Sequence, residues 1–321
     1  MSTRRHARFA GLSCYTANLA AYLDAEVPDV GAALARSVRL AVRAEPAGGL
    51  AFSHHNTPLD RVGDGTVLRY ATLPHRAALV GLADELSRRG RVLLVTDGSR
   101  LPWSPSRHRG TAAPHWLLVT GRRGDAWHVL DAFAGLLPGG EQRPYTGWLS
   151  TAGLTRAAAL PEAWTAEQHM RDAMAFGHPV VPPALLGPLW LRREAEPGPP
   201  APLGGDWIAG DAEALPFLAE RFVEAPERAA RHLDDVWTAA MHRMFRYRWL
   251  LTRPELPAAR RDRLTAAHAA WEQLPSALRF AVDSARRGRP RPSLVRQTFT
   301  NLLDVDPGEE ELLTATRREA P

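Results

Sequence analysis

The stretch HWLLVTGRRGDAWHVLD, residues 115–131, decides the fold of the first half of this 321-residue chain. Its two apolar segments, Trp116–Thr120 and Trp127–Phe133, predict two β-strands. Between them, Arg122–Gly124 fits a three-residue hairpin loop, in which a type I turn is followed by glycine in the left-handed conformation. The stretch therefore predicts an antiparallel pair of strands.

The register of this hairpin brings a histidine and an aspartate together. A three-residue loop closes on Gly121 and Asp125, and counting outward sets His115 directly opposite Asp131 on one face of the sheet. Directly opposed residues have Cβ atoms roughly 4.5–5.5 Å apart, which is within reach of a side-chain hydrogen bond. A β-bulge would shift this register by one residue. Asp131 also lies in an apolar run, residues 129–133, where a buried carboxylate needs a partner.

Helices and strands alternate before this hairpin. The spacing of apolar residues predicts helices over Cys14–Leu23, Val30–Arg43 and His75–Arg89. Residues 66–72 alternate as in a half-buried strand, and residues 91–96 form the continuous apolar run typical of a fully buried strand. This mixture with an antiparallel hairpin predicts the α+β fold class.

The character of the sequence changes after the hairpin region. Residues 178–206 are rich in proline and glycine and predict an irregular linker. Helical patterns follow over Leu215–Phe222, Ala229–Trp249 and Ala258–Arg287. At roughly 150 residues to a domain, we expect two domains. The first is an α+β domain over residues 1–155, and the second, residues 156–321, is a connector followed by a mostly helical domain that packs against the first.

One helix of the second half mixes arginine with aromatic residues, a pattern also seen in proteins that bind nucleic acids. Its residues Met241, Met244, Phe245 and Trp249 are spaced i, i+3, i+4 and i+8. This spacing predicts an apolar core stripe with the arginines on the outer face. We therefore expect no nucleic-acid partner.

Composition excludes several classes of protein. Apolar residues make up 45% of the chain, which is too many for a disordered protein. No apolar run approaches the roughly 18 residues that span a bilayer, so we expect no membrane association. All 40 basic residues are arginine, and the formal net charge is only +5. The sequence has no HExxH, paired-cysteine or Walker glycine motif, so we expect no metal and no other cofactor.

The first residues are similar to two export signals without meeting their requirements. Thr3-Arg4-Arg5 is similar to a twin-arginine signal, and Leu12-Ser13-Cys14 to a lipoprotein cleavage site. Both signals need an apolar stretch of about 7–15 residues, and only Phe9–Leu12 intervenes here. We expect a cytoplasmic protein with a reduced thiol.

Cys14 is the only cysteine and stands where the first helix is predicted to begin. A helix N-terminus favours the thiolate through its positive dipole end, and its N–H groups can stabilise an oxyanion. The alternative is a small buried apolar residue, because free cysteines are among the most buried residues. The His115–Asp131 pair favours catalysis, since an imidazole can take the proton of the thiol and a carboxylate can hold the imidazole in one tautomer. We expect Cys14, His115 and Asp131 to form a catalytic triad.

Two further histidines, His54 and His55, lie in a turn-like region. Solvated loop histidines are the expected interpretation there, and a role in lining a binding cleft is the alternative.

The triad and its surroundings resemble a known family. The order of a cysteine at a helix start, then His115–Gly121 and then His128–Asp131, is similar to that of papain-like enzymes with a Cys-His-Asp triad, including peptidases that trim bacteriocin leaders. The segments GRVLLVTD (residues 90–97) and LPW (residues 101–103), together with Pro114-His115, resemble the butirosin biosynthesis protein H family. Members of that family also carry a helical C-terminal region, which is the extent of the resemblance in the second half.

The resemblance implies a papain-like catalytic domain with a helical domain that walls its cleft. It implies an acyltransferase of antibiotic and other natural-product biosynthesis. Its cysteine would take an acyl group from the phosphopantetheine thioester of an acyl carrier protein and pass it to an amine of a small-molecule acceptor. One feature departs from the pattern, because many papain-like enzymes have a glutamine shortly before the cysteine as an oxyanion donor. This chain has no Gln or Asn between Met1 and Cys14.

Two alternatives stay open. The same triad can hydrolyse its acyl-enzyme, which would make the protein a cysteine peptidase or a thioesterase. A non-catalytic binding protein that retains the fold is the other alternative, which the intact triad residues disfavour.

Overall fold

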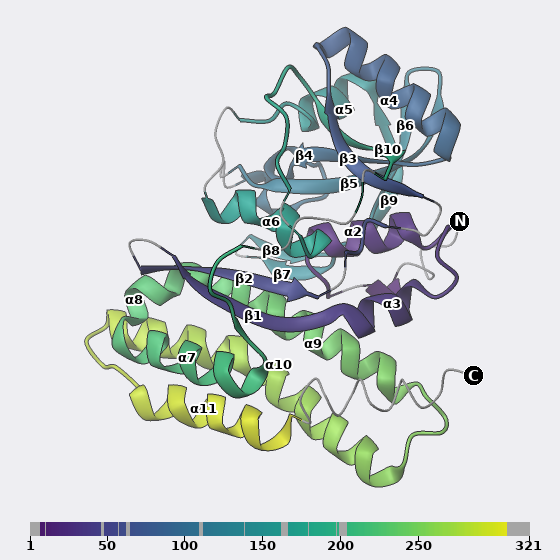
Figure 1. Cartoon of the computed structure of the whole chain (residues 1–321). Coiled ribbons are helices and arrows are strands. Elements are labelled where there is room, and N and C mark those ends of the chain that lie inside the picture. The colour runs from purple at the N-terminus through teal and green to yellow at the C-terminus, as the bar shows by residue number, and fades with distance from the viewer. Residues whose placement is uncertain are drawn as a thin grey trace. The chain divides into compact units, whose positions relative to one another are not determined.

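The computed structural model describes residues 7–9, 11–45, 48–56, 58–61, 65–108, 112–137, 139–161, 166–178, 180–196, 198 and 204–306. The chain divides into two compact units, each built from two separate segments. Unit 1 comprises Met1–Val30 and Pro58–Pro202, and unit 2 comprises Gly31–Thr57 and Leu203–Pro321. Both units combine helices with antiparallel sheets (Figure 1), so the predicted α+β class is confirmed.

Unit 1 is built on a six-stranded antiparallel sheet with the strand order β3-β10-β4-β5-β6-β9. Its strands are β3 (Thr66–Thr72), β4 (Val92–Asp97), β5 (Pro114–Arg123), β6 (Ala126–Asp131), β9 (Tyr145–Ser150) and β10 (Leu189–Ala195). All residues of the central strand β4 are buried, as its continuous apolar run predicts. A two-stranded pair, β7 (Gly135–Leu137) and β8 (Gly140–Gln142), follows β6.

Helices cover both faces of this sheet. They are α2 (Cys14–Leu23), α4 (His75–Arg89), α5 (Thr151–Ala157) and α6 (Ala166–Phe176). Figure 1 shows α4 and α5 on one side of the sheet and α2 on the other. The helices predicted over Cys14–Leu23 and His75–Arg89 are confirmed, and α4 ends where Gly90 adopts the left-handed conformation with φ of 70°.

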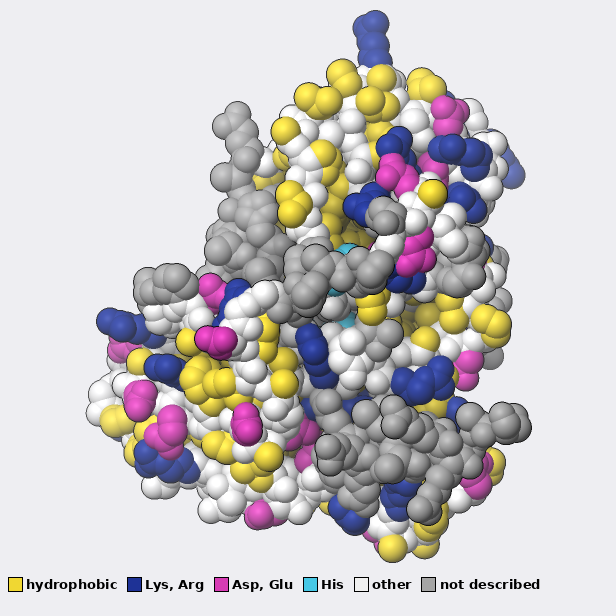
Figure 2. All heavy atoms as spheres, viewed as in Figure 1, with side chains coloured by type: hydrophobic (Ala, Val, Ile, Leu, Met, Phe, Trp, Pro, Cys, Tyr) yellow, Lys and Arg dark blue, Asp and Glu magenta, His cyan; other side chains and the backbone are white. Residues whose placement is uncertain are grey.

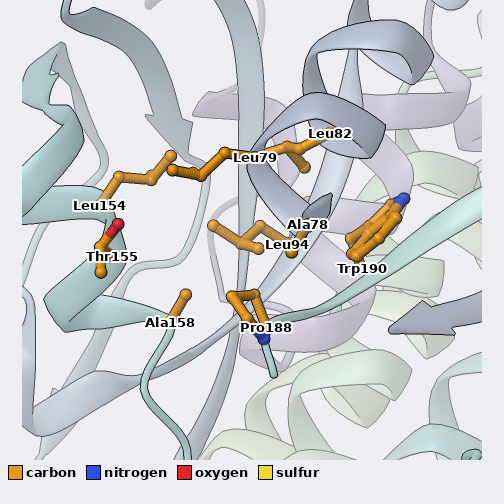
Figure 3. Close-up of a pocket in the computed structure, with 9 residues that line it drawn as sticks. All are labelled: Ala78, Leu79, Leu82, Leu94, Leu154, Thr155, Ala158, Pro188 and Trp190. Atoms are coloured by element: carbon orange, nitrogen blue, oxygen red, sulfur yellow. The ribbon is translucent and has the colours of Figure 1, made fainter. Parts of the chain in front are cut away.

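The side of the sheet that α4 and α5 cover is apolar. Figure 3 shows Leu79 and Leu82 of α4 close to Leu94 of β4 and Leu154 of α5, with Trp190 of β10 beside them. The small pocket among these described residues is lined by apolar side chains and one threonine, Thr155, without a titratable group. It belongs to the hydrophobic core of unit 1.

Unit 2 combines a three-stranded antiparallel sheet, β11-β1-β2, with a set of helices. The strands are β1 (Val38–Glu45), β2 (Gly49–His55) and β11 (Ile208–Ala209). The helices are α3 (Val30–Ser37), α7 (Asp211–Glu224), α8 (Pro226–Ala229), α9 (Leu233–Leu251), α10 (Ala258–Arg286) and α11 (Pro292–Val305). Helix α9 packs against β1, β2 and α10, and α11 packs against α7 and α10. The helical stretches predicted after residue 211 are thus present.

The boundary between the two units differs from the predicted division into residues 1–155 and 156–321. Strand β10 lies inside the predicted linker, and it pairs with both β3 and β4 in the sheet of unit 1. In the other direction, residues 31–57 belong to unit 2, because β1 pairs with β2 and β11. Strand pairing between distant segments, which composition does not reveal, sets this boundary.

The helix predicted over Val30–Arg43 is wrong beyond Ser37, where the chain continues as β1. Val38, Leu40 and Val42 alternate with polar or small residues at the period of a strand, and all three are buried. The apolar positions that match helical spacing over this stretch also match strand spacing, and pairing with β2 decides between them.

Two arginines of α9 lie in the interior, contrary to the predicted outer face. Arg243 and Arg246 are 1% and 3% exposed. Arg243 donates from Nη2 to Asp211 Oδ1 at 2.5 Å, and Arg246 donates from Nη1 to the Val38 carbonyl at 2.9 Å. An ion pair and a backbone hydrogen bond compensate for their loss of hydration. On the face in Figure 2, arginine and acidic side chains are interspersed rather than gathered into a basic field.

The histidines expected in a solvated loop are also buried. His54 and His55 are at the end of β2 and are 1% and 0% exposed. Both rings contact the buried His242 of α9, with centroids 5.4 Å apart for His54 and 5.0 Å apart for His55. Burial lowers the pKa of His54 and His55 well below the ordinary value, and it lowers the pKa of His242 to about 4. Arg39 and Arg243 act in the same direction on His54.

We expect this histidine cluster to make unit 2 unstable in acid. Below about pH 6.5, histidines in the unfolded chain bind protons that the buried rings do not, so the free energy of unfolding falls as the pH falls. The loss is about 1.4 kcal/mol per pH unit for each histidine, and for His242 it continues down to about pH 4. His242→Gln should reduce the slope of this decline by the contribution of one histidine, about 1.4 kcal/mol per pH unit.

Denaturant titrations followed by circular dichroism, from about pH 7.5 to about pH 4.5, measure this slope. Gln297→Ala, at an exposed position of α11 in the same unit, is the control and should leave the slope unchanged, because it removes no titratable group. An equally steep decline in His242→Gln and in the wild type would contradict the assignment.

Candidate active site

Cys14 is the first residue of α2 and is half-buried. The preceding Ser13 caps the helix, because its Oγ accepts from Thr16 N and its carbonyl accepts from Ala17 N. The backbone N–H groups of Cys14 and Tyr15 also lie in the first turn of the helix, and this cap does not bond them. The thiol therefore stands at the positive end of a ten-residue helix.

His115 and Asp131 come from neighbouring strands and are in direct contact. His115 is the second residue of β5, and Asp131 is the last residue of β6. His115 Nε2 donates to Asp131 Oδ2 at 2.9 Å. The two residues are 5% and 0% exposed. The side-chain contact predicted from the hairpin is present.

The register that produces this contact differs from the predicted one. Arg123 pairs with Ala126, so the loop has two residues, of which Gly124 has φ of 56°. The register shifts again between Val119 and Gly121, which sets Leu118 opposite Leu130. One step further, Asp131 is level with Leu117, so His115 and Asp131 are diagonal neighbours rather than directly opposed. Diagonal positions on one face remain within reach of long side chains.

The Asp131 carboxylate is surrounded by hydrogen-bond donors. Besides the bond from His115, Oδ2 accepts from Trp103 Nε1 at 2.8 Å and from Gln142 Nε2 at 2.9 Å. Its Oδ1 accepts from Asn18 Nδ2 and from the Phe133 backbone N–H, both at 3.1 Å. Burial by itself raises the pKa of Asp131, but the charge of His115 and these hydrogen bonds hold it below its ordinary value. Asp131 is therefore a fixed negative charge at the back of the site.

The charge state of His115 follows from these surroundings. Burial opposes protonation of the ring, but the Asp131 carboxylate and the Cys14 side chain together raise the pKa of His115 to about 10. Both residues act by charge and by hydrogen bonding, so Cys14 lies next to the same imidazole. Because Asp131 occupies Nε2, Nδ1 is the nitrogen left for the thiol. At neutral pH the ring is therefore an imidazolium, which places a positive charge beside the Cys14 sulfur.

Asn18 connects the two halves of the site and was missed in the sequence. It lies one turn after Cys14 on α2, and its Nδ2 is shared between the carbonyls of Cys14 and Trp116, at 2.9 and 2.8 Å, and Asp131 Oδ1. Its own Oδ1 accepts from Ala132 N at 3.0 Å. An amide side chain four positions after the cysteine, on a helix whose other residues are mostly apolar, is the signal that could have identified it. Gln142, in a short strand, carries no comparable signal.

Asn18→Ala is expected to lower stability and to loosen the site. The change leaves buried partners on β5 and β6 without their hydrogen bonds, at a cost of about 1–3 kcal/mol for each unsatisfied group. We expect a loss of about 2–4 kcal/mol in the free energy of unfolding, measured by denaturant titration. Asn301→Ala, at an exposed position of α11, is the control. A change in Asn18→Ala as small as in the control would contradict this role.

No protein-family model matches this chain, and no curated protein is detectably similar to it in sequence. These two comparisons therefore assign neither a family nor a function to the chain. Among the described residues, no group of three or more His, Cys, Asp or Glu side chains is arranged to hold a metal ion. In the same part of the chain, no helix has both the length and the apolar character needed to cross a membrane.

Proposed function

We propose that this protein is a cysteine-dependent acyltransferase with a papain-like catalytic unit. The observation that carries the proposal is the arrangement around His115, whose ring lies beside Cys14 at a helix N-terminus and is bonded to the buried Asp131. A thiolate nucleophile, an imidazole acid–base and an orienting carboxylate are the parts that acyl transfer requires. The cysteine-bearing helix α2 against an antiparallel sheet, and the chain order Cys-His-Asp, support the papain-like assignment.

The donor that we propose is the thioester of an acyl carrier protein. The support is the resemblance of residues 90–97, 101–103 and 114–115 to the butirosin biosynthesis protein H family. The acceptor is an amine of a small molecule in natural-product biosynthesis. A reduced catalytic thiol fits a reducing compartment, and we propose the cytoplasm.

Acylation begins from the Cys14 thiolate beside the His115 imidazolium. The thiolate attacks the thioester carbonyl carbon, and the bond from that carbon to the donor sulfur breaks. The departing pantetheine thiolate takes the proton of His115, which leaves a neutral imidazole and an acyl group on Cys14. Asp131 keeps its negative charge throughout and stabilises the cationic form of His115.

Transfer to the acceptor reverses these roles. A neutral amine attacks the acyl carbon on Cys14, and its nitrogen gives one proton to His115. The carbon–sulfur bond to Cys14 breaks, which restores the thiolate beside the imidazolium. Formation of an amide from a thioester makes this second half favourable.

Intact-mass measurement tests the proposal. The wild type is incubated with acyl carrier protein thioesters or with acyl-cysteamine thioesters, and we expect the acyl mass on the Cys14 peptide. Adding an amine should then release an amide. Release of the free acid at the same rate with and without amine would instead identify a thioesterase or peptidase that uses the same triad. A wild type that turns over with amine but never gains acyl mass would rule out the covalent route.

A further inference from the structure

The site described so far has no side-chain donor assigned to the oxyanion. When the thiolate attacks a thioester, the carbonyl oxygen becomes negative, and hydrogen-bond donors must meet it. The Cys14 N–H is one such donor at the start of α2. The glutamine that precedes the cysteine in many papain-like enzymes is missing from residues 1–13. The side-chain N–H groups of Asn18, Trp103 and Gln142 are bonded to Asp131.

Arg171 of α6 binds the edge of β5 next to the triad. Its Nη1 donates to the carbonyl of Pro114, the residue before His115, at 3.2 Å. The carbonyl of Trp116, two residues on, accepts from Asn18, which also bonds the Cys14 carbonyl. Carbonyls two residues apart in a strand point to the same edge, about 7 Å apart. Arg171 and α2 therefore meet the same edge of β5.

Tyr15, the neighbour of Cys14, gives a second indication of this proximity. Its ring stacks on Trp116, with centroids 4.3 Å apart, and α6 packs against α2. Burial raises the pKa of Tyr15 well above its ordinary value, the charges of Asp172 and Cys14 raise it further, and the charge of Arg171 opposes them. The charges of Arg171 and Cys14 therefore both act on the Tyr15 side chain, which indicates that the guanidinium and the thiol lie near the same residue.

Most of the N–H groups of the Arg171 guanidinium have no acceptor in the described part of the chain. Among the described residues, Arg171 makes the one hydrogen bond to Pro114 and no ion pair with a carboxylate within 4.0 Å. It is half-buried, and a guanidinium carries five N–H groups. A partly buried arginine that uses one donor on a carbonyl leaves most of its fork for an anion.

We propose that Arg171 donates a hydrogen bond to the oxyanion formed on the acyl group at Cys14. This inference rests on the proposed acyl transfer. As the Cys14 sulfur bonds to the carbonyl carbon, the π electrons move to oxygen, which accepts from the Cys14 N–H and from Arg171. When the carbonyl reforms, the donor's carbon–sulfur bond breaks and its thiolate takes the proton of His115. A charged donor also suits an oxygen whose charge exists only in the tetrahedral intermediate.

Two reactions of the same thiol separate this role from simple positioning. Acylation by a thioester develops an oxyanion, whereas alkylation by iodoacetamide is a displacement at carbon that develops none. In Arg171→Ala we expect acylation to slow about 10²–10³-fold, with the alkylation rate unchanged. Arg91→Ala is the control, since Arg91 donates to the Tyr22 carbonyl toward the other end of α2, and both rates should stay at the wild-type value. Added guanidinium ion should restore part of the acylation in Arg171→Ala.

Each other outcome overturns a distinct part of the inference. If acylation and alkylation fall together, Arg171 only positions His115 through Pro114. If the loss is confined to donors whose acyl group carries a carboxylate, Arg171 binds that carboxylate and not the oxyanion. If neither rate changes, the oxyanion is stabilised without Arg171. A wild type that is alkylated at Cys14 but never acylated by thioesters overturns the acyltransferase proposal itself and this role with it.

Discussion

Replacing Cys14 by alanine is expected to abolish both acyl-enzyme formation and turnover. The acyl group has no other thiol to bond, because Cys14 is the only cysteine of the chain, and the hydroxyls of Ser13 and Thr16 at the start of α2 are bonded to each other. Cys14→Ser should be nearly as damaging. An alcohol has a far higher pKa than a thiol, so the serine hydroxyl keeps its proton, and His115, which Asp131 holds as an imidazolium, cannot remove it. Intact-mass spectrometry after rapid quenching, with carrier-bound donor and no acceptor, measures the first step directly.

The fold of both variants should be unchanged, since a half-buried thiol contributes little to packing. Circular dichroism and denaturant titration provide that control. Product formation in Cys14→Ala at more than a trace of the wild-type rate would mean that the acyl group passes directly from donor to acceptor. His115 would then act on the acceptor alone.

Asp131→Asn is expected to lower the turnover rate by about 10²–10⁴, by analogy with the tautomer effect in serine triads. The amide fills the same space among Asn18, Trp103 and Gln142, so the fold should persist, but at lower stability, because its NH2 group cannot accept the hydrogen bonds of the oxygen that it replaces. It removes the negative charge that raises the pKa of His115 to about 10. His115 should therefore lose its proton at a lower pH in the variant, and the thiolate should lose its cationic partner with it.

The pH dependence of Cys14 alkylation measures this second effect. In the wild type the imidazolium persists as the pH rises until it is lost near pH 10, and in Asp131→Asn this transition should move toward neutral pH. Asp97→Asn is a comparison at another buried carboxylate of unit 1, whose bonds go to Ser99, Ala113 and Arg100. An alkylation profile in Asp131→Asn that coincides with the wild type would contradict the proposed orientation of His115.

The elements that local patterns specify were predictable from the sequence. The helix at Cys14–Leu23 has its serine cap, and the helix at His75–Arg89 has its amphipathic spacing and terminal glycine. Strand β10 and the strand pairing of residues 38–45 were not predictable, because their partners lie far away along the chain. Local spacing carries no information about such partners.

The candidate site likewise has a part that was predictable from the sequence and a part that was not. The contact of His115 with Asp131 followed from a short hairpin, and it survived an error in register because a shift that keeps both side chains on one face still leaves them in reach. The other side-chain partners of Asp131 come from three separate elements or loops. Arg171 comes from a helix that was not identified in the sequence at all. A carboxylate in an apolar stretch of sequence indicates that the group needs partners when it is buried, but it does not indicate where along the chain those partners lie.

The exchange of segments between the two units has a consequence for how the chain folds during synthesis. The β1–β2 hairpin emerges from the ribosome early, but its partners β11, α7 and α9 follow only after all of residues 58–202. Strand pairing in unit 1 is also delayed, but by less, because β4 has no neighbour on one side until β10 has been synthesised. Contacts of such long sequence separation form slowly, since the loop that they close loses much conformational freedom. The apolar residues of the β1–β2 hairpin therefore stay exposed until most of the polypeptide has been synthesised. This makes the hairpin the part of the nascent chain most in need of protection from aggregation.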